Sequence, residues 1–312
     1  MEGFDNNDSI VNQPSAEIPS TPETSTPTET STPNEVLLQN VHGLSEEELR
    51  DVNKIKVTIA DTAAPIVILF GPASCGKTMT LVRLARYLNR QGYTLEPVRT
   101  FRPSFDTNYK TMCDEFANIV NSDDAAKRTD NISFLLVKVI KNGRTLCQIL
   151  EGPGELYFNP MKAHQEFPTY VHSIFNNEAL RKIMVFFVEP NYLDEENRRN
   201  YVSTINQVRQ SSNKQKHIFL YNKIDLTEFV ITPGQVHLVA ARHQVEVDYP
   251  NIFTYFKNTN PITSLWNPYN FEFLPFQTGT YTKPASGDLV YIQGSDSYPR
   301  MLWEKLLKCI KG

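Results

Sequence analysis

Residues 71–78 read Gly-Pro-Ala-Ser-Cys-Gly-Lys-Thr and match the spacing G-x-x-x-x-G-K-[ST]. An uninterrupted apolar run, rich in β-branched side chains, precedes this stretch at residues 65–70 and predicts a buried parallel strand. Leucine and alanine at helical spacing follow it at residues 77–90. A strand, a glycine-rich turn and a helix in this order predict a phosphate-binding loop. The loop restricts the chain to α/β folds in which a buried strand leads directly into the loop and a helix follows it.

The residue types in this loop suit phosphate chemistry. Glycines let backbone N–H groups converge on phosphate oxygens, and the helix N-terminus adds its positive end. Lys77 would reach the β- and γ-phosphates, where we also expect it to act in catalysis, and the Thr78 hydroxyl would bind Mg²⁺. An ordinary strand-to-helix turn does not explain this lysine and threonine. The nucleotide contacts expected from the loop are Gly71, Ala73, Ser74, Cys75, Gly76, Lys77, Thr78 and Met79.

The remaining pattern alternates between strands and helices. We predict further strands at residues 131–141, 145–151, 183–188, 217–221 and 271–276, and helices at residues 45–54, 77–90, 194–210, 234–244 and 298–310. Asn142-Gly143 between the first two of these strands indicates an antiparallel hairpin. The fold class is therefore α/β, a doubly wound, mostly parallel six-stranded P-loop NTPase sheet with one antiparallel edge strand and helices on both faces.

Composition sets the domain limits. Residues 20–33 are almost wholly Ser, Thr, Pro and Glu, so we expect residues 1–40 to be a disordered tail. Residues 41–312 would form one domain, with insertions near 93–130, where no strong strand is evident, and 230–270. The aromatic side chains of 250–275 would form either a partner surface or the core of that insertion.

Charge and hydropathy exclude several classes of protein. The formal net charge of -4 excludes binding to nucleic acid through bulk positive charge. The four cysteines form no C-x-x-C pair, which argues against a zinc knuckle or a disulfide framework. Neither a secretory signal nor an apolar run of about 20 residues is present, so we expect a cytoplasmic protein without a transmembrane segment.

A second motif, Asn222-Lys-Ile-Asp225, directly follows the strand predicted at 217–221. Guanine presents an N1–H and a 2-amino group side by side, and the Asp225 carboxylate can accept from both. Adenine lacks this pair of donors, so a site built on Asp225 would reject ATP. Asn222 would tie this loop to the phosphate loop, and the Lys223 stem would cover the base.

With both motifs in this order, residues 65–312 resemble the translation-factor-related class of P-loop GTPases, near its Ras-like and signal-recognition-particle-receptor-β-like members. The chain also resembles bacterial double-GTPase-type proteins with a Thr/Pro-rich tail. The resemblance implies a switch that binds GTP and GDP with Mg²⁺, hydrolyses GTP to GDP, and meets a protein effector or regulator. It implies no oligomeric state.

The resemblance also implies roles for the switch segments. Glu151 stands where the family has an aspartate near Mg²⁺, and Gly154 would offer its backbone N–H to the γ-phosphate. Glu155 occupies the water-orienting position, where a carboxylate would act as a base or repel the γ-phosphate. Thr129 is the candidate switch threonine, so the expected catalytic residues are Lys77, Glu155 and Thr129 and the expected metal ligands Thr78, Thr129 and Glu151. Thr278 lies in the loop expected to touch the guanine oxygen.

Two alternatives to a hydrolysing switch follow from the same residues. The first is a guanine-nucleotide-binding scaffold without hydrolysis, because Glu151 and Glu155 both depart from the hydrolytic pattern. The second is an ATPase or nucleotide kinase, which would leave Asn222 to Asp225 without a purpose.

Overall fold

The computed structural model describes residues 44–121, 134–162, 165–192, 194–210, 215–282 and 290–312. Within these residues the chain forms a seven-stranded sheet of order β2-β3-β4-β1-β5-β6-β9. Its strands are β1 (Ile66–Phe70), β2 (Thr94–Pro97), β3 (Leu135–Lys141), β4 (Arg144–Glu151), β5 (Lys182–Val188), β6 (Lys216–Tyr221) and β9 (Glu272–Pro275). The predicted α/β class with a mostly parallel sheet is confirmed.

The strand count and the sheet edge differ from the prediction. Strands β4, β1, β5, β6 and β9 pair in parallel, and β3 and β4 form the expected antiparallel hairpin. Strand β3 is not at the edge, however, because β2 pairs antiparallel with its outer side. The sheet therefore has seven described strands in place of six. Strand β2 lies inside the segment 93–130, where the sequence indicates no strong strand. Its four residues alternate between exposed and half-buried and end in a proline, so no apolar run indicates it.

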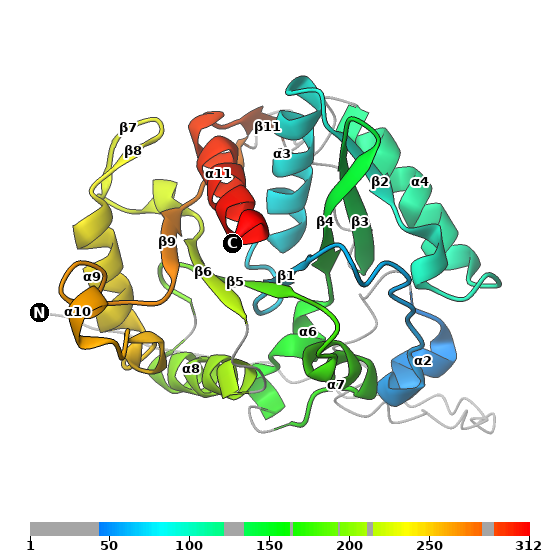
Figure 1. Ribbon diagram of the computed structural model, residues 1–312, viewed down its shortest axis with the longest axis horizontal. Helices are drawn as coiled ribbons and strands as arrows, with labels where there is room; N and C mark the ends of the chain where they lie inside the picture. Colours follow the sequence, from blue (N-terminus) through cyan, green and yellow to red (C-terminus); the bar gives the residue numbers. More distant parts are fainter. Residues whose placement is uncertain (1–43, 122–133, 163–164, 193, 211–214, 283–289) are drawn as a thin grey trace, which may run out of the picture.

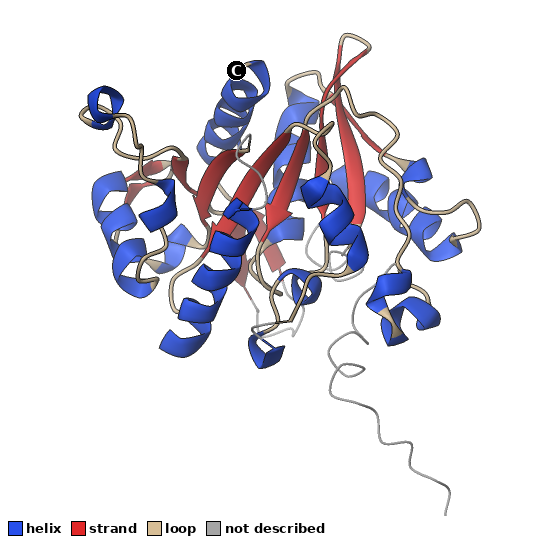
Figure 2. Cartoon of the chain, turned by 60° about the horizontal axis from the view of Figure 1, so that its bottom comes forward, coloured by secondary structure: helices blue, strands red, loops and turns tan. Residues whose placement is uncertain are grey.

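Helices cover both faces of the sheet, as predicted (Figures 1 and 2). In Figure 1, α3 and α11 lie above the sheet, whereas α7 and α8 lie below it. The described helices are α2 (Glu46–Arg50), α3 (Lys77–Arg90), α4 (Thr107–Asn121), α6 (Gly154–Tyr157), α7 (Thr169–Asn176), α8 (Glu195–Gln210), α9 (Leu238–Asp248), α10 (Pro261–Ser264) and α11 (Ser297–Lys311). In the part of the chain that the structure describes, no helix is long and apolar enough to cross a bilayer.

Among the described residues, two small two-stranded sheets lie outside the main sheet. Strands β7 (Val230–Thr232) and β8 (Gln235–Val236) precede α9, which therefore begins at Leu238, later than predicted. Strands β10 (Gly279–Thr282) and β11 (Val290–Gln293) follow β9 and lead into α11. The second hairpin places residues 277–279 beside the carboxyl end of the sheet.

The core lies beneath the phosphate loop. Every residue of β1 and β5 is buried, and each large apolar side chain that leaves water there stabilises the fold by about 1.5–3 kcal/mol. Phe253, Phe256 and Phe271 pack edge-on against Phe219 of β6, so this part of the 250–275 stretch is core. Trp266 is 87% exposed and does not share that role.

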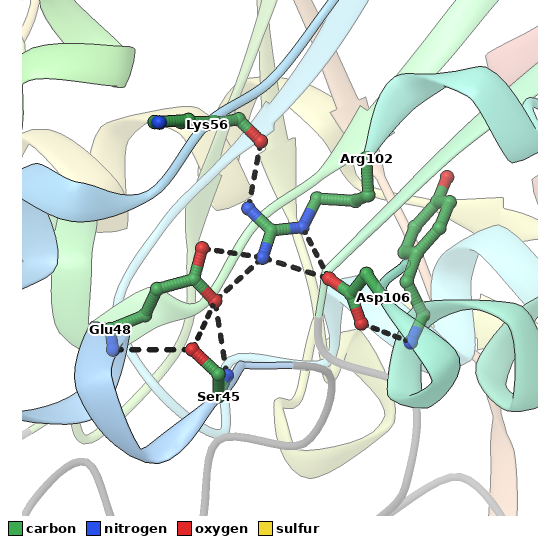
Figure 3. Close-up of polar contacts among 6 residues, drawn as sticks. Ser45, Glu48, Lys56, Arg102 and Asp106 are labelled. Carbon is green, nitrogen blue, oxygen red and sulfur yellow. Dashed lines mark hydrogen bonds and ion pairs between the residues drawn. The ribbon is translucent and has the colours of Figure 1, made fainter. Parts of the chain in front are cut away.

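A buried ionic cluster fastens α2 to the start of α4 (Figure 3). The Arg102 guanidinium donates to both Glu48 carboxylate oxygens at 2.6 Å, to Asp106 at 2.9 Å and to the Lys56 carbonyl at 2.8 Å. Glu48 also accepts from the Ser45 backbone and hydroxyl, and the Ser45 hydroxyl accepts from the Glu48 backbone N–H, which completes the predicted capping box.

Candidate nucleotide-binding site

The carboxyl ends of the parallel strands bring several predicted site residues, together with Glu189, to one edge of the sheet. Gly71 follows β1, and Glu151 ends β4 opposite Leu69 of β1. Glu189 follows β5, and Asn222 follows β6. Residues far apart in the sequence therefore meet at the start of α3.

The phosphate loop has the backbone shape that its glycines allow. Gly76, with φ of 88°, is the N-cap of α3, and Ser74 also has a positive φ of 60°. The Lys77 ammonium donates to the carbonyl oxygens of Gly71 at 3.1 Å and Pro72 at 2.7 Å, so its charge lies within the loop. The Lys77 side chain is buried, which strengthens its field at the loop.

The remaining loop residues have distinct surroundings. Ala73 and Met79 are half-buried, and the exposed Ser74 faces solvent at the crest of the loop. Cys75 is buried, and burial raises the pKa of its thiol to about 11, so the thiol stays protonated. The backbone of Cys75, rather than its thiol, makes the contact described below with Asn222.

The turn after β4 packs directly on the phosphate loop. A Cβ at Gly154 would lie 2.3 Å from the Ala73 nitrogen and 2.4 Å from the Pro72 carbonyl carbon. Only glycine permits this approach of two backbones. The structure therefore places Gly154 directly against residues 72 and 73 of the loop.

Thr78 and Glu151 form the second contact between these segments. The Thr78 hydroxyl donates to Oε1 of Glu151. Burial raises the pKa of Glu151 to about 7, although the Thr78 hydrogen bond and the positive charge of Lys77 oppose the shift. The other carboxylate oxygen, Oε2, is buried without a hydrogen-bond partner among the described residues.

This donor set fits Mg²⁺. A carboxylate and a hydroxyl are the oxygen ligands that this ion prefers, and the partnerless Oε2 atom of Glu151 can accept from a metal-bound water. No group of three or more His, Cys, Asp or Glu side chains within the described ranges could hold a metal. An ion here would therefore need further oxygens from a phosphate group. Thr129, the third predicted ligand, lies outside the described residues.

The Asn222-Lys-Ile-Asp225 segment meets the phosphate loop as predicted. The Asn222 amide donates to the Cys75 carbonyl at 2.8 Å, and its backbone N–H donates to Val188 at 2.8 Å. Lys223 has a φ of 55° and pairs through its ammonium with Glu189, whose pKa is raised by burial. Asp225 is exposed on the 3₁₀ turn Ile224–Leu226.

The segment after β9 lies against this turn. The Ile224 N–H donates to the Phe276 carbonyl at 3.2 Å, and the Phe276 N–H donates to Tyr221 at 2.8 Å. Thr278 follows two residues later, and its carbonyl accepts from the Tyr291 hydroxyl at 2.7 Å. The structure thus places Thr278 in a loop that adjoins the Asp225 turn.

Glu155 lies apart from these contacts. It is half-buried in the first turn of α6. Its carboxylate forms no hydrogen bond or ion pair with any residue that the structure describes.

Sequence reasoning missed Glu189 and Tyr291. Glu189 directly follows a buried strand, a position that could have indicated a site residue. Tyr291 contacts the Thr278 carbonyl from a hairpin that carries no motif, so no signal in the sequence indicates it.

A scan against protein-family models found no match, and a search of curated proteins found none either. Among solved structures, the GTP-bound Ski7 GTPase-like domain of S. cerevisiae is similar with a TM-score of 0.39 and 16% identity, over 86% of this chain and 53% of that one. The chain thus spans about half of that structure. The septin GTPase domain of Chlamydomonas reinhardtii has a TM-score of 0.35 and 10% identity, over 80% of this chain and 94% of that one. At these TM-scores neither likeness assigns a function to this chain.

Proposed function

We propose that this protein is a guanine-nucleotide-binding switch that uses Mg²⁺ and hydrolyses GTP to GDP. The observation that carries the proposal is the hydrogen bond of 2.8 Å from the Asn222 amide to the Cys75 carbonyl. It joins a base-recognition motif to a phosphate-binding loop across the strand ends. A loop with either motif alone would not need this junction.

Each part of the nucleotide has a candidate partner in the proposal. The loop N–H groups and Lys77 would bind the phosphates, with Gly154 approaching the γ-phosphate. Asp225 would accept from the two guanine donors, and the Lys223 stem, fixed by its ion pair with Glu189, would cover the base. The loop that contains Thr278 would meet the 6-oxygen.

Thr78 and Glu151 would hold Mg²⁺, with Thr129 as the proposed third ligand. The ion would neutralise charge on the β- and γ-phosphates. Glu151 in this arrangement accepts directly from Thr78 and keeps its second oxygen for the hydration shell.

Hydrolysis depends on Glu155 in this proposal. Its position in the first turn of α6, one residue after Gly154, is consistent with a base that deprotonates the attacking water. A second candidate function is a scaffold that binds GTP without hydrolysing it. Two departures from the family's pattern favour it: Glu151 replaces the aspartate, and a carboxylate at Glu155, one residue after Gly154, would repel the γ-phosphate.

The proposal extends to the whole chain. Residues 41–312 would be the GTPase domain, and residues 1–40 a tail outside it. A protein effector or regulator in the cytoplasm would recognise the GTP-bound state.

Lys77→Ala tests the phosphate loop. The loss of the ammonium should abolish measurable GTP binding by calorimetry while circular dichroism stays normal. Lys110→Ala, at an exposed lysine of α4, is the matched control and should bind as wild type. Unchanged GTP affinity in Lys77→Ala would overturn the proposal.

Turnover then separates the two candidate functions. If Glu155 acts on the attacking water, Glu155→Ala should slow GTP hydrolysis with little change in affinity. If the scaffold is correct, wild type should show no turnover, and Glu155→Ala should raise the affinity for GTP relative to GDP.

A further inference from the structure

The β10–β11 hairpin contacts the loop 277–279 through Tyr291 of β11. The Tyr291 hydroxyl on β11 donates to the Thr278 carbonyl at 2.7 Å. Gly279, the first residue of β10, lies so close to β11 that a Cβ there would be 2.5 Å from the Tyr291 ring and from the Ile292 carbonyl oxygen. Burial raises the pKa of Tyr291, which keeps its hydroxyl protonated as a donor.

The segment that directly follows β11 is hydrogen-bonded to α3, the helix that begins at the phosphate loop. Arg83 is fully buried on α3, and its guanidinium donates to the Gly294 carbonyl at 2.5 Å and to Asp296 at 2.8 Å. Gly294 in turn lies against Gln277, because a Cβ there would be 3.5 Å from the Gln277 side chain. Arg83 thus holds the residue that follows β11, and β11 holds the loop 277–279 through the strand pair Gly279–Gln293 and the Tyr291 hydrogen bond.

The loop is also fixed from its other end. Phe276 is bonded both to β6 and to the turn that carries Asp225. The loop thus lies between the candidate base-recognition turn on one side and Tyr291 on the other. A shift of Thr278 would change its distance from any base that Asp225 holds.

We propose that Tyr291 is a positioning residue for guanine recognition, whose hydroxyl holds the loop 277–279 where a backbone N–H meets the 6-oxygen of the base. This inference rests on the proposed function, because it requires a guanine nucleotide in the site. It adds a determinant of specificity that belongs to neither motif. Arg83 supports the same arrangement by fixing the hairpin to α3.

Tyr291→Phe tests the inference, because it removes the hydroxyl and keeps the ring that packs on Gly279. The full chain would be titrated with the 5′-diphosphates of three bases: guanine, hypoxanthine, which keeps the 6-oxygen, and 2-aminopurine, which lacks it. Tyr291→Phe should weaken binding of the first two by about 5- to 10-fold, the value of one hydrogen bond. Binding of the 2-aminopurine nucleotide should stay within about twofold of wild type, because it has no 6-oxygen to misplace.

Tyr269→Phe is the matched control. Its hydroxyl donates to Glu246 at 2.7 Å on the α9 side of the sheet, so its loss should leave all three affinities unchanged. The inference is overturned if Tyr291→Phe binds GDP as wild type does, or if it loses affinity equally for all three nucleotides. Failure of wild type to bind GDP at all would instead overturn the proposed function, and this inference with it.

Discussion

At the scale of single residues, the junction of the two motifs depends on space as well as on hydrogen bonds. A Cβ at Gly76 would lie 2.3 Å from the Asn222 amide nitrogen that donates to Cys75. The φ of 88° at Gly76 already disfavours any other residue. Gly76 thus permits both the shape of the loop and its bond to Asn222.

Gly76→Ala should therefore both strain the backbone and displace the Asn222 side chain. Gly143 provides the control, because its φ is 74° and nothing lies within 4 Å of its Cβ position. Gly143→Ala should cost about 1 kcal/mol of unfolding free energy, from the positive φ alone, and leave GDP affinity unchanged. Gly76→Ala should cost more in urea unfolding and weaken GDP binding at least tenfold by displacing Asn222. Equal effects of the two substitutions would show that the Asn222 contact does not matter.

The residues that could be predicted are those whose chemistry fixes their identity. Lys77, Thr78, Asn222 and Asp225 stand at spacings typical of phosphate or guanine recognition, so the sequence alone singles them out as candidates. Tyr291 could not be predicted, because it contacts a backbone carbonyl and many side chains can occupy such a position. For such contacts only the structure identifies the partner.

At the scale of elements, the ionic cluster in Figure 3 joins the first described helix to the body of the protein. The side chains of Arg102 and Glu48 are only 1% and 10% exposed. A buried arginine with several partners holds them in one arrangement. Its removal leaves buried carboxylates without a cation in the protein interior, where an unpaired charge is unfavourable.

Arg102→Met should destabilise the protein by about 3–5 kcal/mol, because Glu48 and Asp106 would lose their cation. Arg99→Met is the matched control: this arginine pairs with Asp114, but both side chains are more than half exposed. Its replacement should cost less than about 1 kcal/mol. Urea unfolding followed by circular dichroism measures both, and comparable losses would contradict the account of α2 docking.

Elements with long apolar runs or strong periodicity could be predicted, and short half-exposed ones could not. Strands β1, β5 and β6 read as continuous apolar segments, and α3 shows helical spacing. Strand β2 has exposed positions at Thr94 and Glu96, so tertiary pairing with β3 decides its conformation. The β7–β8 hairpin likewise lacks buried side chains that would produce a pattern.

At the scale of the whole molecule, the stability should depend on pH through His217 of β6. This side chain is 3% exposed and stacks parallel to Phe186 at a centroid distance of 6.0 Å. Burial, with a further contribution from the positive charge of Arg209, lowers the pKa of His217 to about 3. The folded protein therefore keeps this imidazole neutral at pH values where the unfolded chain protonates it.

This difference in pKa determines how the free energy of unfolding changes with pH. Well above pH 6.5, His217 does not change the free energy of unfolding. As the pH falls from there towards the folded pKa, the imidazole is protonated in the unfolded chain but stays neutral in the folded protein, so the free energy of unfolding decreases. Between pH 7 and pH 5 the loss should be about 2 kcal/mol. His217→Phe should flatten the dependence of unfolding free energy on pH by that amount. An unchanged slope in the variant would show that His217 titrates normally in the folded protein.

The central claim, that the two motifs form one guanine-nucleotide site, is tested most directly by exchanging the base preference. Wild type should bind GDP and not ADP, as measured by calorimetry. Asp225→Asn turns one acceptor into a donor, so it should weaken GDP binding by at least about 2 kcal/mol. Xanthine carries an oxygen in place of the 2-amino group, and the variant should therefore gain affinity for xanthosine diphosphate. ADP binding as tight as GDP binding in wild type, or no exchange of preference in Asp225→Asn, would contradict the claim.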